Sequence, residues 1–154
     1  MKISVRGQYA LRALIVLGLK PEREAVVAAQ EISERQNIPK RFLEQILNDL
    51  KGAGIVESKR GVTGGYRLRR QADDISLAEI IRRIDGPLAP LSCVSEQFYE
   101  KCTCPDESRC GIRSVMKEVR TAIVRILENV SLAQLCERVQ TLQGPHENPM
   151  DYVI

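Results

Sequence analysis

The chain has 154 residues, of which 44% are hydrophobic and 28% charged, and its formal net charge is +3. This length and composition indicate one globular domain, or one small domain with an appendage, and exclude disordered and fibrous proteins. The apolar stretch near the N-terminus is interrupted by Arg12 and has no small-residue cleavage site. We therefore expect neither a signal peptide nor a membrane-spanning helix, and no membrane partner.

The charge is unevenly distributed along the chain. Residues 1–72 contain 14 Lys and Arg against 7 Asp and Glu, a net charge of +7, whereas residues 73–154 carry −4. A basic N-terminal half predicts a module that binds a polyanion, joined to an acidic half that senses or oligomerises. The alternative is a solvated basic face without a partner.

Three amphipathic helices are predicted in the N-terminal half. Apolar residues recur at three- and four-residue steps in three stretches: residues 4–20, 27–36 and 39–52. The last two are separated only by Asn37 and Ile38, and Pro39 suits the first turn of a helix because it lacks an N–H. Two short helices joined by such a tight turn predict a helix-turn-helix.

A β-hairpin is predicted directly after these helices. Residues 55–58 and 66–69 have the pattern of strands, and the basic, glycine-rich turn over residues 59–65 separates them. A helix-turn-helix followed by a basic hairpin predicts a winged helix, which binds double-stranded DNA with its second helix in the major groove.

Both the second helix of this motif and the hairpin carry side chains suited to DNA. On the helix, opposite the apolar residues, these are Lys40, Arg41, Glu44 and Gln45. On the hairpin they are Lys59, Arg60, Gly61 and Tyr66. Arg60 is the residue that we expect in the minor groove. The alternatives are a helix face that is merely polar and a hairpin whose charge is coincidental.

The C-terminal half is predicted to be helical on either side of one loop. A helix over residues 76–84 begins at Ser76, with Glu79 completing a capping box. A loop over residues 88–109 leads to a long amphipathic helix over residues 112–130, whose apolar stripe needs a partner, and a last helix follows Ser131. We expect a mainly α fold with a small hairpin, in four segments: a winged helix-turn-helix domain (1–72), a connecting helix and cysteine-rich loop (73–110), dimerisation helices (111–143) and a tail (144–154).

The five cysteines are an odd number and fit a disulfide framework poorly. Cys136, on the apolar face of the last helix, is interpreted as core. The other four lie on one loop with the spacing C-x8-C-x-C-x5-C: Cys93, Cys102, Cys104 and Cys110. Because thiolates bind iron or zinc and paired C-x2-C knuckles are absent, this pattern favours an iron–sulfur cluster over a zinc site, a thiol switch or inert thiols. No catalytic motif occurs, and we expect a non-enzyme in the reducing cytoplasm.

Nearly the whole chain resembles the Rrf2 family of bacterial winged-helix transcription regulators, and within it the branch of the iron–sulfur cluster regulator IscR. The matching stretches are MKISVRGQYALRAL, EISERQNIPKRFLEQILNDLKGAGIVESKRGVTGGYRL, ISLAEIIRRIDGP and the cysteine loop running into CGIRSVM. The resemblance implies a homodimer built on the long helix from Ile112, a partly palindromic operator, and a cluster held by three loop cysteines and a variable fourth ligand. It also assigns DNA contacts to Glu44 and Arg60.

By position, the resemblance assigns the cluster to three thiols: Cys93, Cys104 and Cys110. Cys102 is then an alternative to Cys104 or the fourth ligand. The iron–sulfur regulator has a histidine where this chain has Arg113, which cannot ligate, and the nitric-oxide-sensing branch has an acidic residue where this chain has Gln8. The cluster is expected to be [2Fe-2S] rather than [4Fe-4S], and the signal to be iron–sulfur or redox status, or nitric oxide.

The tail suggests an alternative function. Residues 150–154, MDYVI, resemble the aromatic-rich end of family members that lack cluster cysteines and repress cysteine biosynthesis with cysteine synthase as partner. On this interpretation the chain is a metal-free regulator of sulfur metabolism, controlled by thiol oxidation or by cysteine synthase bound to the tail. A tail that packs on its own dimer is the plainer alternative.

Overall fold

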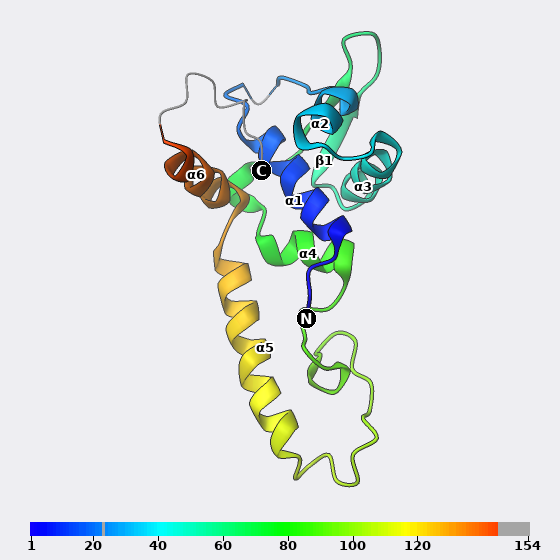
Figure 1. The fold of residues 1–154 in the computed structure, drawn as a ribbon, viewed down its shortest axis with the longest axis vertical. Helices are drawn as coiled ribbons and strands as arrows, with labels where there is room; N and C mark the ends of the chain where they lie inside the picture. Colours follow the sequence, from blue (N-terminus) through cyan, green and yellow to red (C-terminus); the bar gives the residue numbers. More distant parts are fainter. Residues whose placement is uncertain (23, 145–154) are drawn as a thin grey trace.

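The computed structural model describes residues 1–22 and 24–144 (Figure 1). Its helices are α1 (Val5–Gly18), α2 (Ala29–Gln36), α3 (Lys40–Gly52), α4 (Leu77–Asp85), α5 (Gly111–Asn129) and α6 (Leu132–Gln143). Strands β1 (Val56–Lys59) and β2 (Gly65–Leu68) form an antiparallel hairpin, and short 3-10 turns cover Ala72–Asp74 and Ser92–Val94. The mainly helical fold with one hairpin confirms the expected class.

The core lies around α1, which contacts α2, α3, α4, α6 and β2. Its small residues Ala10 and Ala13 are fully buried, so neighbouring backbones approach closely. Large aliphatic side chains from the other elements complete the core: Ile32, Leu43, Ile46, Leu47, Leu50, Ile55 and Leu132. Since each such side chain contributes about 1.5–3 kcal/mol on burial, the winged-helix part of the chain is held mainly by this cluster.

The segment before α2 differs from the sequence prediction. Val27 was expected in the helix, but it is extended and pairs with Tyr66, with N–H···O distances of 2.9 and 2.8 Å between their backbones. Ala28 is the N-cap of α2 and is exposed, not inward-facing. Val27 is β-branched and fully buried, and its backbone bonds to the hairpin replace those that a further helical turn would make.

The capping box expected at Ser76 is incomplete. The Ser76 hydroxyl accepts the Glu79 N–H at 3.1 Å, but the Glu79 carboxylate pairs with Arg70 instead of returning to the cap. A complete capping box occurs at the start of α6, between Ser131 and Gln134. Arg70 lies outside α4, and helical spacing does not place its side chain, so this competition arises only in the folded chain.

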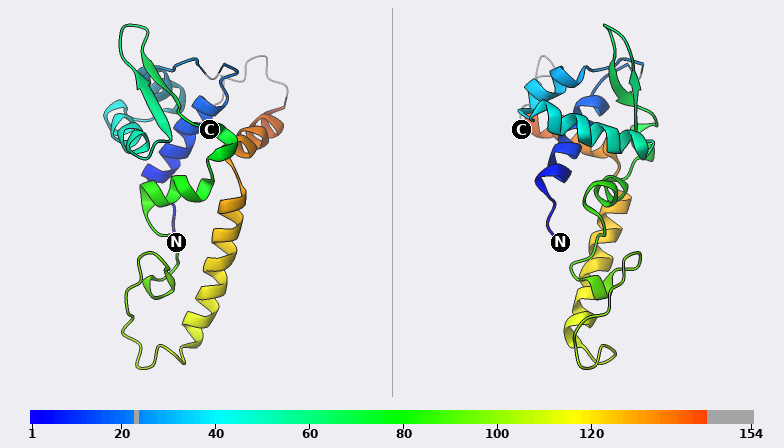
Figure 2. Two further views of the ribbon diagram at one scale, coloured as in Figure 1. Left: turned by 180° about the vertical axis from the view of Figure 1, so that it is seen from behind. Right: turned by 90° about the vertical axis from the view of Figure 1, so that its right-hand side faces the viewer.

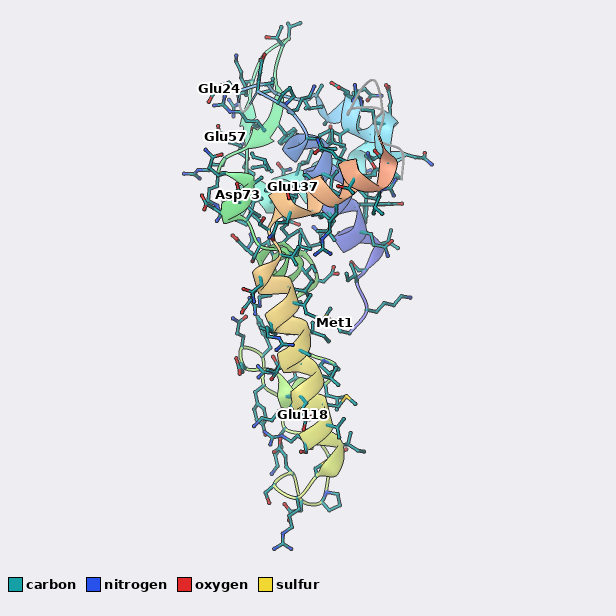
Figure 3. All side chains as sticks on the ribbon, turned by 90° about the vertical axis from the view of Figure 1, so that its left-hand side faces the viewer. Met1, Glu24, Glu57, Asp73, Glu118 and Glu137 are labelled. Carbon is teal, nitrogen blue, oxygen red and sulfur yellow. The ribbon has the colours of Figure 1, made fainter. Side chains whose placement is uncertain are left out.

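Helix α6 packs back onto α1, and this contact buries Cys136 as the sequence predicted. Cys136 is 6% exposed, and a Cβ on Gly18 would lie 2.8 Å from its Sγ. In Figure 3, Glu137 of α6 lies among the packed helices. Glu118 lies on the part of α5 that extends away from them.

Helix α5 has no fully buried residue. One face packs Ile123, Val124 and Leu127 against Ala78, Ile81 and Leu88. The other leaves apolar side chains exposed: Ile112, Val115, Val119 and Ile126. Within residues 1–22 and 24–144, no helix is long and apolar enough to cross a membrane. This exposed stripe on α5 has no partner among the described residues.

Candidate DNA-binding surface and metal centre

Helix α3 presents a polar face because its apolar side is used in the core. Lys40, Arg41 and Gln45 are exposed, and Glu44 is half-buried. Asn37, in the left-handed conformation at φ 49°, reverses the chain between α2 and α3. Asparagine tolerates this conformation better than most residues, which explains the short turn. Four predicted base-reading residues thus lie on one helix, at its N-terminal end.

Aromatic and cationic contacts fix this end of α3 on α1. The rings of Tyr9 and Phe42 meet edge to face with centroids 5.9 Å apart, and the Arg12 guanidinium lies 5.4 Å from the Tyr9 centroid. Arg12 also donates to the side-chain oxygen of Gln36 at 3.3 Å and to its backbone carbonyl. Because Gln36 is almost fully buried at the end of α2, these bonds join α1 to α2, and the Tyr9–Phe42 contact joins α1 to α3. The polar face of α3 is therefore held in a definite orientation.

The hairpin is the wing, and its tip carries the predicted cations. Lys59, Arg60 and Gly61 are all exposed, and Gly61 has φ +115°, a conformation that favours glycine. Figures 1 and 2 show this tip projecting from the same end of the molecule as α2 and α3. The wing is anchored to α3 by a hydrogen bond of 2.7 Å from Lys51 Nζ to Ser58 Oγ.

The base of the wing is held by an ion-pair group and by Tyr66. Arg67 of β2 pairs with Glu57 of β1 at 2.6 Å and with Glu24, and Figure 3 shows both carboxylates near the hairpin. Tyr66, also a predicted DNA contact, is half-buried, packs on the core and pairs with Val27. The structure thus places Tyr66 in β2 opposite Ser58, one residue pair from Lys59 at the end of β1, whereas Arg60 and Gly61 lie in the turn beyond the strands.

The loop before α5 lies at the opposite end of the molecule (Figure 2), and its four cysteines line one hollow there. The Sγ atoms of Cys104 and Cys110 are 4.0 Å apart. Cys93, Cys102 and Glu107 offer ligand atoms that all lie within 4.8 Å of one another. The sequence pattern therefore predicted residues that the fold brings together, but it did not single out Glu107, whose position between Cys104 and Cys110 was the available signal.

The protonation of these thiols depends on their mutual contacts. A hydrogen bond from the Cys104 backbone lowers the pKa of Cys102, whereas hydrogen bonding to Cys102 raises the pKa of Cys104 to about 12. Burial raises the pKa of Cys93, which is 6% exposed. Cys102 therefore ionises more readily than Cys93 and Cys104, whose ionisation a nearby cation would favour.

Cys110 and Arg113 connect this group to α5. The Cys110 side chain caps the helix by accepting the Arg113 N–H at an N···S distance of 3.4 Å. The Arg113 side chain turns back into the loop and donates to the Cys93 carbonyl at 3.2 Å. Cys93 and Cys110, the first and last cysteines of the loop, are therefore both bonded to Arg113 in the first turn of α5.

The donor set fits an iron–sulfur cluster. Four thiols and one carboxylate lie together, with Leu91 and Ile112 lining the same surface hollow. Thiolates are the ligands of iron–sulfur clusters and of zinc, and apolar neighbours limit access of solvent. Cys102 is hydrogen-bonded to both Cys93 and Cys104, and the Cys104 and Cys110 sulfurs are 4.0 Å apart, so the four sulfurs form one continuous group from which a cluster could take its ligands.

Residues 3–138 match the family described as "Rrf2: Iron-dependent Transcriptional regulator". A putative HTH-type transcriptional regulator, rrf2-like, of Rhodobacter capsulatus is 42% identical over 136 residues, 86% of this chain and 91% of that protein. The structure of CymR, titled the global cysteine regulator of B. subtilis, has a TM-score of 0.77 at 29% identity and covers 91% of this chain and 99% of its own. The structure of T. potens IscR has a TM-score of 0.73 at 28% identity, covering 99% and 97%.

Proposed function

The chain belongs to the Rrf2 family of transcriptional regulators, which are not enzymes, and we propose that it is a homodimeric repressor or activator whose operator affinity depends on an iron–sulfur cluster bound at the cysteine loop. The observation that carries this proposal is the gathering of four thiols from a segment of eighteen residues at the cap of α5. The similarity to IscR and to an iron-dependent family supports it. A regulator of this kind acts in the cytoplasm, where DNA is present and thiols stay reduced.

DNA binding is assigned to α3 and the wing. Lys40, Arg41, Glu44 and Gln45 would read bases in the major groove, and Lys59 and Arg60 would contact phosphates or the adjacent minor groove. Gly61 has no side chain and would let the tip of the wing approach the DNA backbone closely. Tyr66 would act by positioning the wing. Arg60→Ala is expected to weaken operator binding about tenfold and to reduce the slope of log affinity against log salt by about 1. Arg138→Ala, the same charge change on exposed α6, should leave both quantities unchanged.

Dimerisation is assigned to the exposed stripe of α5. Val119 is 38% exposed and Ile126 is 58% exposed on the same face of a helix of 19 residues. A second copy of the same helix would cover this stripe, and the resulting two-fold symmetry requires a partly palindromic operator. Ile126→Glu should give a monomer in sedimentation experiments, whereas Thr121→Glu, on the opposite face, should remain a dimer.

The cysteine loop is placed to couple metal binding to the dimer. A bound iron–sulfur cluster would supply a centre that accepts or loses an electron and is sensitive to oxidants and nitric oxide. The Cys110 side chain caps α5, so coordination there would change the first turn of the dimerisation helix, and Arg113 would pass the change to the Cys93 backbone. A shift between two dimer geometries needs only about 1–3 kcal/mol to change operator affinity severalfold.

The decisive experiment is anaerobic purification followed by iron and sulfide analysis and by operator titration with and without the cluster. We expect a coloured protein with [2Fe-2S] absorption rather than that of a [4Fe-4S] cluster. Ser substitutions at Cys93, Cys104 and Cys110 should each abolish it, and Cys136→Ser is the matched control. A Cys102→Ser variant that keeps a normal cluster removes Cys102 from the ligand set. A colourless protein without iron would contradict the proposal.

A second candidate function is a metal-free regulator of cysteine metabolism. The separation of 4.0 Å between the Cys104 and Cys110 sulfurs favours it, since oxidation could join them, and the structure similar to CymR supports it. Intact mass would then show a loss of two hydrogens after mild oxidation, together with changed operator affinity. The tail through which cysteine synthase would bind lies outside the described residues.

A further inference from the structure

Glu107 lies inside the group of thiols instead of on the outer surface of the loop. Its side chain is 19% exposed, although most acidic residues of the loop face solvent. A carboxylate oxygen is within 4.8 Å of the Sγ atoms of both Cys93 and Cys102. An anionic carboxylate beside ionised thiols is electrostatically unfavourable unless cations balance the charge, as the Arg113 guanidinium does for Glu107 and as a metal would for the whole group.

Two side chains hold the Glu107 carboxylate in this place. Arg113 Nε lies 3.1 Å from one of its oxygens, and the Tyr99 hydroxyl donates to the carboxylate at 2.7 and 2.9 Å. The next residue toward the N-terminus, Asp106, accepts bonds from Ser108 N and Oγ at 2.9 and 2.6 Å, so the loop backbone around Glu107 is also fixed. A carboxylate that binds a metal is commonly oriented by hydrogen-bonding partners of this kind.

These contacts suit a ligand better than a simple ion pair. Arg113 already interacts with the Cys93 carbonyl through the same Nε, so the guanidinium bridges the carboxylate to the backbone of a thiol donor. Tyr99 and Arg113 leave the carboxylate next to the sulfurs and not turned away from them. With Glu107 included, three thiolates are enough to complete the four ligand positions of a two-iron cluster.

We propose that Glu107 is an oxygen ligand of the metal centre at the cysteine loop, positioned by Arg113 and Tyr99. This inference rests on the proposed function, because it assigns a ligand to the same centre. An oxygen donor is harder than a thiolate and binds iron less covalently. The site therefore has one weaker ligand, through which iron is released or replaced more readily than from a site of thiolates alone.

The test compares Glu107→Gln, Glu107→Cys and a control, Glu118→Gln, after anaerobic reconstitution. Glu118 is an exposed carboxylate on α5. Measurements are iron and sulfide per chain, circular dichroism in the visible range, electron paramagnetic resonance of the reduced protein, and the half-life of the cluster in excess chelator. Unfolding of the metal-free variants checks that each one folds.

We expect Glu107→Gln to change both spectra and to shorten the half-life in chelator by about tenfold or more. Glu107→Cys should restore retention, with the spectrum shifted toward all-thiolate ligation, and Glu118→Gln should match the parent protein. Arg113→Ala should shorten the half-life to a smaller extent with only a small spectral change, as a positioning residue does.

Two failures are distinguishable. If the parent protein binds iron and sulfide and Glu107→Gln has the same spectra and half-life, the ligand assignment is wrong and the proposed function stands. If the parent protein binds no iron and sulfide under these conditions, the proposed function is wrong, and the assignment of Glu107 is overturned with it.

Discussion

Gly65 provides a sharp test of how the wing is attached. A Cβ built at this position would lie 2.5 Å from the Val27 carbonyl oxygen, 2.6 Å from its carbon and 2.9 Å from the Ala28 nitrogen. All three atoms belong to backbone and cannot rotate away. In Gly65→Ala the wing must therefore move from Val27, and the two backbone hydrogen bonds between Val27 and Tyr66 are lost or stretched.

The magnitude follows from these contacts. Two net hydrogen bonds contribute about 1 kcal/mol each, and the steric displacement costs about 1–3 kcal/mol. Replacing Gly by Ala also lowers the conformational entropy of the unfolded chain, which offsets about 0.4–1 kcal/mol of this loss of stability. The expected loss is about 2–4 kcal/mol in the free energy of unfolding, which for a chain of this size lowers Tm by about 5–15 °C.

The assay is thermal unfolding followed by circular dichroism at fixed protein concentration, combined with operator titration. Gly111→Ala is the matched control, because nothing lies within 4 Å of a Cβ at that position. The control should unfold within about 2 °C of the parent, while Gly65→Ala should unfold earlier and bind the operator more weakly at a temperature where both are folded. Equal Tm values for Gly65→Ala and the parent protein would refute this account of the wing.

Three further outcomes are expected. Ser131→Ala removes the capping box of α6 and should cost about 1 kcal/mol of stability, measured by denaturant titration, whereas Ser131→Asp should retain most of it. Asn37→Ala should lower the free energy of unfolding by about 1 kcal/mol, because Ala at φ 49° lacks the polar side chain that helps Asn to adopt this conformation. Asn37→Gly should lower it less in the same titration, because Gly has no Cβ. Burial raises the pKa of Cys136 to about 11, so this thiol is protonated at pH 8 and should stay unlabelled by iodoacetamide in the native metal-free chain, with labelling rising only as pH approaches 11 or the chain unfolds. Peptide mass mapping that finds Cys136 labelled as fast as in urea would contradict its core position.

The exposed face of α3 and the exposed tip of the wing were both predictable because they follow from local patterns. In α3, Leu43, Ile46 and Leu50 occupy the inner side at helical spacing, and this spacing alone places Lys40, Arg41 and Gln45 outside. In the wing, glycines around a Lys-Arg pair indicate a tight, basic turn whatever the hairpin packs against. The crowding of four cysteines in one loop likewise indicated a shared site before any fold was known.

The features that sequence reasoning missed depend on partners outside the element concerned. Val27 is extended because Tyr66, 39 positions later, supplies its backbone bonds, and Glu79 leaves its cap because Arg70 is brought beside it. Helical periodicity has no information about either partner. It therefore predicted that the helix of residues 27–36 begins before α2 does, and that Glu79 completes the capping box at Ser76.

Residue patterns were enough to predict a winged helix with a basic, exposed face, a long helix with an apolar stripe, and a group of thiols on one loop. They could not predict which of these groups meet, because a loop pattern names the donor residues without the directions of their side chains. Glu107 lies beside Cys93 and Cys102 because Tyr99 and Arg113 hold its carboxylate there. This geometry forms only when the loop folds back on the first turn of α5.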